Sequence, residues 1–164
     1  MSETNQNSLV AYGFKLPLIG AAPGTEPTIA VFHDWIRTRV FTDDVLIDVA
    51  DYGHVKGGPG VLLVCHEGHY VIDHGRGQVG LAYHRRRGEP SASADETARV
   101  ALARLVRAAR LLERDERVAI TFDTTALEVR ALDRLHAPND DEGWAVVEGP
   151  LRAAITAVWG EPPV

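Results

Sequence analysis

Gly60-Val-Leu-Leu-Val-Cys65 is the stretch that decides the fold class. A continuous apolar run of this length is typical of a strand covered on both faces, so it predicts a central strand of a sheet. Residues 45–50 are also largely apolar and predict a strand before it. Residues 69–73 continue in extended conformation, the glycines of 74–77 favour a turn, and residues 78–84 return as a partner strand. The sequence therefore predicts an antiparallel hairpin beside the central strand.

Helical periodicity flanks this strand-rich block on both sides. From Thr28, apolar residues recur at steps of three and four and predict a helix that ends near Phe41. After the block, Ser93-Ala-Asp-Glu96 reads as a capping box, in which the two outer side chains can bond backbone donors of the first turn. Helical spacing then continues to about Arg114. We expect this second helix to pack on the sheet.

The last third of the chain predicts two more strands and one more helix. Residues 118–122 and 127–131 alternate apolar and other side chains around a turn, and they predict a second hairpin. Asn139-Asp-Asp-Glu142 predicts the start of a helix that kinks or divides at Gly149-Pro150. The expected order is α-β-β-β-α-β-β-α, which is typical of an α+β fold with about three helices on a mainly antiparallel five-stranded sheet.

The chain is short enough to form one domain, because no linker-like segment divides its 164 residues. We expect residues 1–8 to be a disordered tail. Residues 9–27 carry three prolines and three glycines, which predicts an irregular arm. Residues 28–160 are expected to form the single α+β domain, and 161–164 a C-terminal tail.

Composition restricts the classes of function. The net charge is −6, which disfavours nucleic acid as a partner, because phosphate contacts require a concentrated positive surface. No apolar run reaches the roughly 20 residues of a membrane span, and the N-terminus lacks a signal peptide. Cys65 is the only cysteine, so no disulfide can form within the chain. We therefore expect a cytoplasmic protein with no membrane association, and the abundance of Arg, Ala and Gly favours a GC-rich bacterial genome.

A cluster of histidines and acids suggests a metal or acid–base site. Imidazole and carboxylate are ligands for transition metals such as Zn²⁺, so we take His54, His66 and His69 as candidate metal ligands. Asp51, His54 and Glu67 are the candidate catalytic groups. A hairpin edge with hydrated histidines is the alternative interpretation. The cluster spans 27 positions and comprises Asp48, Asp51, His54, His66, Glu67, His69, Asp73 and His74.

Arginines form one strongly basic region, from Arg85-Arg-Arg87 into the second helix. Four of the helix arginines fall outside the main apolar stripe and predict a solvated face that an acidic protein could bind; they are Arg99, Arg107, Arg110 and Arg114. No RNA-binding motif accompanies them. Among the tryptophans, Trp144 is expected in the core, and Trp159 is a candidate for contact with another chain.

Two hypotheses of function follow from these patterns. The first is a small binding or assembly module that self-associates or contacts another protein through its sheet or helix faces. The second is a metal-dependent or acid–base enzyme that uses the cluster between Asp48 and His74. The two differ in whether the imidazoles converge on one point, since a metal site needs ligand atoms about 2.0–2.2 Å from a common centre.

Overall fold

The computed structural model describes residues 11–87 and 92–160, so the predicted tails at 1–8 and 161–164 lie outside the described residues. It confirms the α+β class, but with seven strands in place of five. In chain order the elements are β1 (Tyr12–Ile19), α1 (Thr25–Thr38), β2 (Leu46–Asp51), β3 (Val61–Cys65), β4 (Gly68–Asp73), the 3-10 turn η1 (Gly75–Gly77), β5 (Gly80–Arg85), α2 (Ala94–Glu113), β6 (Thr121–Phe122), β7 (Glu128–Ala131) and α3 (Asp141–Trp159).

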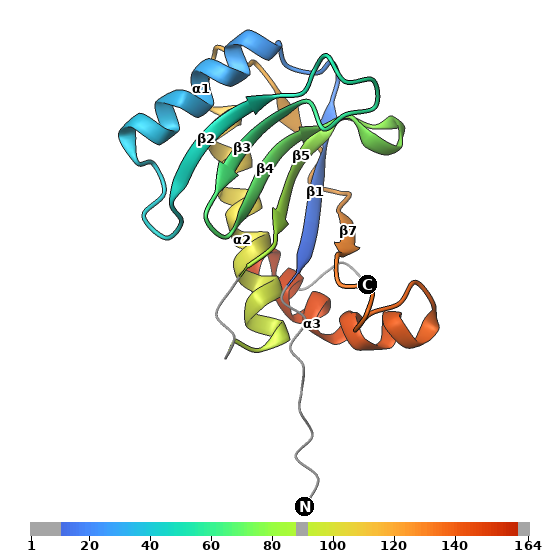
Figure 1. Cartoon of the computed structure of the whole chain (residues 1–164). Coiled ribbons are helices and arrows are strands. Elements are labelled where there is room, and N and C mark those ends of the chain that lie inside the picture. Colours follow the sequence, from blue (N-terminus) through green and yellow to red (C-terminus); the bar gives the residue numbers. More distant parts are fainter. Residues whose placement is uncertain (1–10, 88–91, 161–164) are drawn as a thin grey trace, which may run out of the picture.

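The strands form one antiparallel sheet in the order β2-β3-β4-β5-β1-β6, and β7 also pairs with β1 (Figure 1). The predicted hairpin is confirmed, because β4 and β5 pair over their whole length on either side of η1. β3 lies between β2 and β4 and is therefore interior, as its apolar run predicts. The central block nevertheless contains four strands and not the three of the expected order, because the segment 60–73 does not continue as one strand but turns back on itself as β3 and β4.

The irregular arm predicted for residues 9–27 is wrong, because this segment contains β1, a strand inside the sheet. Its Pro17 is tolerated for a local reason. The carbonyl of Pro17 accepts the N–H of Asp123, so it faces the side of β1 where β6 and β7 pair. The N–H that a proline lacks would face this same side. On that side β7 pairs only as far as Lys15 and β6 begins at Leu18, so Pro17 lies in the gap between them.

The second hairpin is also corrected. β6 pairs with Leu18 and Ile19, whereas β7 pairs with residues 12–15, so both strands bind β1 and not each other. The alternation of side chains predicted extended segments correctly. The alternation did not indicate which strand each segment pairs with. Both β6 and β7 pair with the same edge of β1, a strand that the sequence did not predict.

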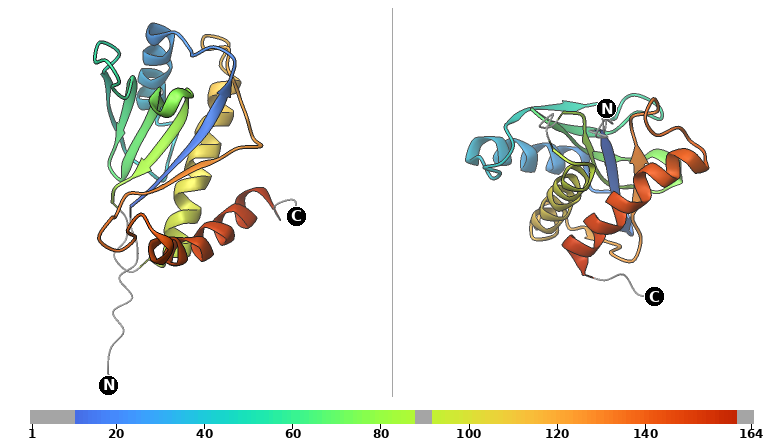
Figure 2. Two further views of the ribbon diagram at one scale, coloured as in Figure 1. Left: turned by 90° about the vertical axis from the view of Figure 1, so that its right-hand side faces the viewer. Right: turned by 90° about the horizontal axis from the view of Figure 1, so that it is seen from below.

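The helices lie mainly on one face of the sheet. α1 packs on β2 and β3, and α2 packs on β1 and β5 (Figures 1 and 2). α3 packs against α2 below the sheet in the view of Figure 1. Between these layers one hydrophobic core includes Phe14, Leu63, Tyr83, Leu102 and Leu151.

The helix ends agree largely with the sequence. The Ser93 hydroxyl accepts from the N–H of Glu96, and Asp140 caps α3 by accepting from the N–H of Gly143. α3 is a single helix with Pro150 inside, so a division into two helices is wrong.

The core position expected for Trp144 is also wrong, since 53% of this residue is exposed. Within the described residues, no helix combines the length and apolar character needed to cross a membrane.

Candidate functional site

The histidine and acid cluster is divided between the two ends of the β2–β3 hairpin. Asp51 and His54 lie at one end, and His66, Glu67 and His69 lie at the other. Antiparallel strands rise about 3.4 Å per residue, so the two ends are separated by roughly 15 Å. Across residues 11–87 and 92–160, no three His, Cys, Asp or Glu side chains are placed to hold one metal ion. The structure brings together only the second group.

Within the second group, His66, Glu67 and His69, the side chains point in different directions. Tyr70 belongs to the core, so its neighbour His69 points to the opposite face of the sheet, where it is half-buried. His66 is exposed in the turn between β3 and β4. The carboxylate of Glu67 ion-pairs with Arg104 of α2. Asp51 accepts the N–H of Gly53 at 2.8 Å in an exposed turn.

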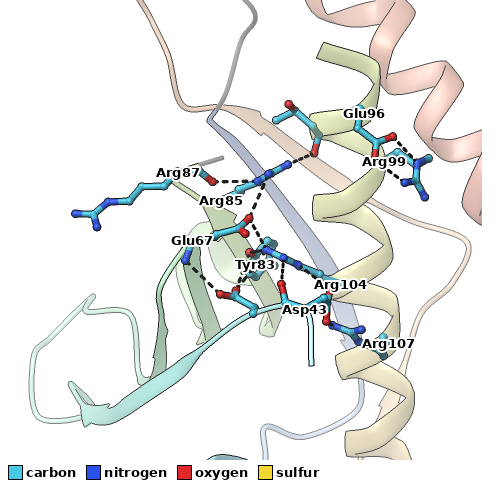
Figure 3. Close-up of polar contacts among 11 residues, drawn as sticks. Asp43, Glu67, Tyr83, Arg85, Arg87, Glu96, Arg99, Arg104 and Arg107 are labelled. Carbon is cyan, nitrogen blue, oxygen red and sulfur yellow. Dashed lines mark hydrogen bonds and ion pairs between the residues drawn. The ribbon is translucent and has the colours of Figure 1, made fainter. Parts of the chain in front are cut away.

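A buried arginine is the centre of the largest polar network that the structure describes (Figure 3). Arg104, in the middle of α2, is only 4% exposed. Its Nη1 donates to Glu67 Oε2 at 2.8 Å and to the Tyr83 hydroxyl at 2.9 Å. Its Nε donates to Asp43 Oδ2 at 3.2 Å, and Asp44 Oδ2 lies 3.4 Å from Nη1. One guanidinium therefore joins α2 to the loop before β2, the β3–β4 turn and β5.

Burial and the neighbouring cations shift the pKa values of the acids in this network. Burial raises the pKa of the fully covered Asp44 carboxyl, and nearby Arg104 only partly opposes this shift. For Asp43, burial would raise the pKa, but Arg107 and Arg104 outweigh it and lower the pKa overall. Burial also raises the pKa of the Cys65 thiol, which disfavours the nucleophilic thiolate. We interpret the network as a structural clamp.

Arg85 is a second buried arginine in the same clamp, with 5% of its surface exposed. It donates to the carbonyls of Thr97 and Arg87, and its Nη2 lies 3.2 Å from Glu67 Oε2 (Figure 3). Glu67 thus serves both buried arginines. Every charge in the interior of the clamp has an opposite charge beside it, as buried ions require.

Sequence reasoning missed this clamp, although one signal could have indicated it. Arg104 lies three residues after Ala101 and four before Ala108, and both alanines are fully buried. Residues at these spacings share one side of a helix, so Arg104 falls on the apolar stripe and not outside it. The acids Asp43 and Asp44 lie in a loop, where no periodicity predicts which helix they contact.

The outward side of α2 forms a groove with the end of α3, a hollow of about 500 Å³. Arg110 and Arg114 are exposed there and make no ion pair within the described parts of the chain. Arg107 pairs with Asp43 and lies over the Phe41 ring, and Arg99 pairs with Glu96. We call this hollow the α2–α3 groove; its lining residues are Arg99, Ala103, Val106, Arg107, Arg110, Leu111, Arg114, Ala157 and Val158.

Comparisons with known proteins do not indicate a function for this chain. Comparison with protein-family models finds no match. Comparisons with curated proteins and with solved structures also find none. The function of the chain is therefore inferred from the placement and the chemistry of its own residues, among which the arginines of the α2–α3 groove form a distinct surface.

Proposed function

We propose that the protein is a protein-binding module whose α2–α3 groove binds an acidic amphipathic helix of a partner. The observation that carries the proposal is the composition of the groove. Four arginines surround five apolar side chains, and no acidic residue lines the hollow, although the whole chain has a net charge of −6. A local positive surface on an acidic protein is a feature that selects among partners.

The apolar floor supports a helix as the occupant. Val106, Leu111 and Val158 lie between two packed helices, and such grooves accept the apolar side of a third helix with its residues at i, i+3, i+4 and i+7. Acidic residues beside that apolar side would then reach the guanidinium groups of Arg110 and Arg114. Guanidinium can bind a carboxylate through two parallel hydrogen bonds, which favours acidic side chains over other polar ones.

A second copy of the same groove is a poor occupant. A twofold contact would place the four arginines of one groove against the same four of its partner, and like charges in contact oppose association. The self-association expected from the sequence therefore receives no support from this groove. An acidic partner of different sequence satisfies the charges better.

The test uses two synthetic amphipathic peptides that share a leucine side and carry either glutamates or lysines on the other. We expect the glutamate peptide to bind the full chain and the lysine peptide not to bind, as measured by fluorescence anisotropy. The double variant Arg110→Glu/Arg114→Glu should weaken binding by at least about tenfold, because two charge-assisted contacts become repulsive.

Arg152→Glu is the matched control, because Arg152 is an exposed arginine of α3 outside the groove and pairs with Glu148. Its affinity for the glutamate peptide should equal that of the wild type. Equal binding of both peptides, or equal loss in the control and the double variant, would refute the proposal. Sedimentation of the unliganded chain would reveal self-association if a second copy were the occupant.

A further inference from the structure

A second hollow, of about 380 Å³, lies where the β3–β4 turn meets the end of β5, and it shares no lining residue with the α2–α3 groove. It combines four side chains that can carry positive charge with a short apolar wall. We call it the His–Arg hollow; it is lined by Ile47, Val64, Cys65, His66, Glu67, Gly68, His69, Arg86 and Arg87.

Among the described residues, Glu67 is the one carboxylate of this lining, and its charge is already compensated. Glu67 Oε2 accepts from Arg104 at 2.8 Å and lies 3.2 Å from Arg85, so its charge is directed into the clamp (Figure 3). Arg86 and Arg87 are exposed, and neither side chain makes an ion pair with another described residue. The hollow therefore presents an excess of positive charge to solvent.

Backbone contacts hold the two arginines in place. The N–H groups of Arg86 and Arg87 both donate to the carbonyl of Glu67 at 2.9 Å. Gly68 allows this close approach, because a Cβ there would lie 2.4 Å from the carbonyl oxygen of His84. These contacts hold the β3–β4 turn against the end of β5. They therefore fix the backbone positions from which the side chains of Arg86 and Arg87 extend.

His69 contributes a polar atom without a partner. Its Nδ1 is buried and makes no hydrogen bond with any described residue. Burial and the nearby Arg86 lower the pKa of His69, and the backbone of Gly68 and the Asp44 carboxylate only partly oppose them. His84 is the cross-strand neighbour of His69. A negative charge bound beside His69 would favour its imidazolium form and would therefore oppose this shift.

We propose that the His–Arg hollow binds the phosphate group of a small phosphate monoester. Arg86 and Arg87 supply the guanidinium groups for the phosphate oxygens, and His66 and His69 supply imidazole donors. Ile47 and Val64 offer apolar contact to the organic part of the ligand. The volume is at the lower end of small-molecule sites, which favours a compact ligand. The proposal is independent of the α2–α3 groove.

Phenyl phosphate is the probe, and NMR signals of the His66 and His69 imidazoles are the readout. We expect saturable shifts of both imidazoles, and a rise in the pKa of His69 when the ligand is bound. Arg86→Ala/Arg87→Ala should weaken binding by at least about tenfold, because two charged donors are lost. Inorganic phosphate should bind more weakly than phenyl phosphate if the apolar wall contributes.

Arg110→Ala/Arg114→Ala is the control, because these arginines line the other hollow, and its affinity for phenyl phosphate should match that of the wild type. Far-ultraviolet circular dichroism verifies the fold of each variant. Unchanged affinity in Arg86→Ala/Arg87→Ala, or absence of shifts at millimolar phenyl phosphate in the wild type, would overturn the proposal. Either result leaves binding of the acidic peptide to the α2–α3 groove unaffected, so the two proposals fail separately.

Discussion

The two sides of α2 use the same residue type for opposite purposes. On the inner side, Arg104 is 4% exposed and is surrounded by Asp43, Asp44 and Glu67. On the outer side, Arg110 and Arg114 are exposed and have no ion pair within the described chain. The inner arginine has no capacity left for a ligand, whereas the outer arginines retain theirs.

This difference teaches that arginine count alone does not locate a binding surface. A buried guanidinium must be neutralised by its own protein, because an unpaired charge in the interior is strongly unfavourable. An exposed guanidinium is hydrated and can exchange water for an external carboxylate. Substitutions on the two sides of α2 should therefore affect different measurements, stability on one side and binding on the other.

The largest effect is expected for Arg104→Ala. This variant leaves the covered carboxylate of Asp44 without its cation, and breaking a buried ion pair from one side destabilises a protein by about 3–5 kcal/mol. Urea unfolding followed by circular dichroism measures the change. The free energy of unfolding of Arg110→Ala, on the other side of α2, should stay within about 0.5 kcal/mol of that of the wild type. A similar loss in both variants would abolish the distinction between the two sides.

A smaller effect, which depends on pH, is expected for Asp44→Asn. Because the pKa of Asp44 is raised in the folded protein, ionisation of this carboxyl opposes folding, and its contribution to stability falls as pH rises above about 4. Asparagine cannot ionise, so the variant should gain stability relative to the wild type between about pH 4 and pH 7. Urea midpoints across this range test the sign. A constant difference would show that the pKa of Asp44 is not raised.

The smallest effect is expected for Arg99→Ala, on the outer side of α2. Arg99 and Glu96 form a bidentate pair, but both side chains are about half exposed. Exposed pairs three residues apart on a helix contribute about 0.2–0.5 kcal/mol. The urea midpoint should therefore move only slightly, and the shift should vanish at high salt. A loss comparable to that of Arg104→Ala would show that exposure does not control these contributions.

The sequence predicted the parts of the fold that have a local signal. The hairpin of β4 and β5, the cap at Ser93 and the interior position of β3 all follow from patterns within short windows. β1 was missed because Pro17 argues against a central strand, and only the gap between β6 and β7 makes that proline acceptable. Such gaps are properties of tertiary pairing, which a single window does not contain.

The candidate sites were predicted less well than the fold. The sequence placed Asp51, His54, Glu67 and the metal candidates in one cluster because they are near in the chain, but the hairpin separates its two ends. The exposed arginines of α2 were predicted from helical spacing, and Arg110 and Arg114 confirm it. The two hollows were beyond prediction, because each is lined by segments that meet only in the folded chain.

The position of β1 has a consequence for how the chain folds during synthesis. β1 is the first strand that the structure describes, yet its partners β5, β6 and β7 all follow much later in the chain. The emerging strand must therefore remain unpaired on the ribosome at least until β5, which ends about halfway along the 164-residue chain, has been translated. Pairings between distant segments fold slowly and leave strand edges exposed to aggregation. Chaperone dependence of newly made protein should accordingly fall when β1 is moved, by circular permutation, to follow β7.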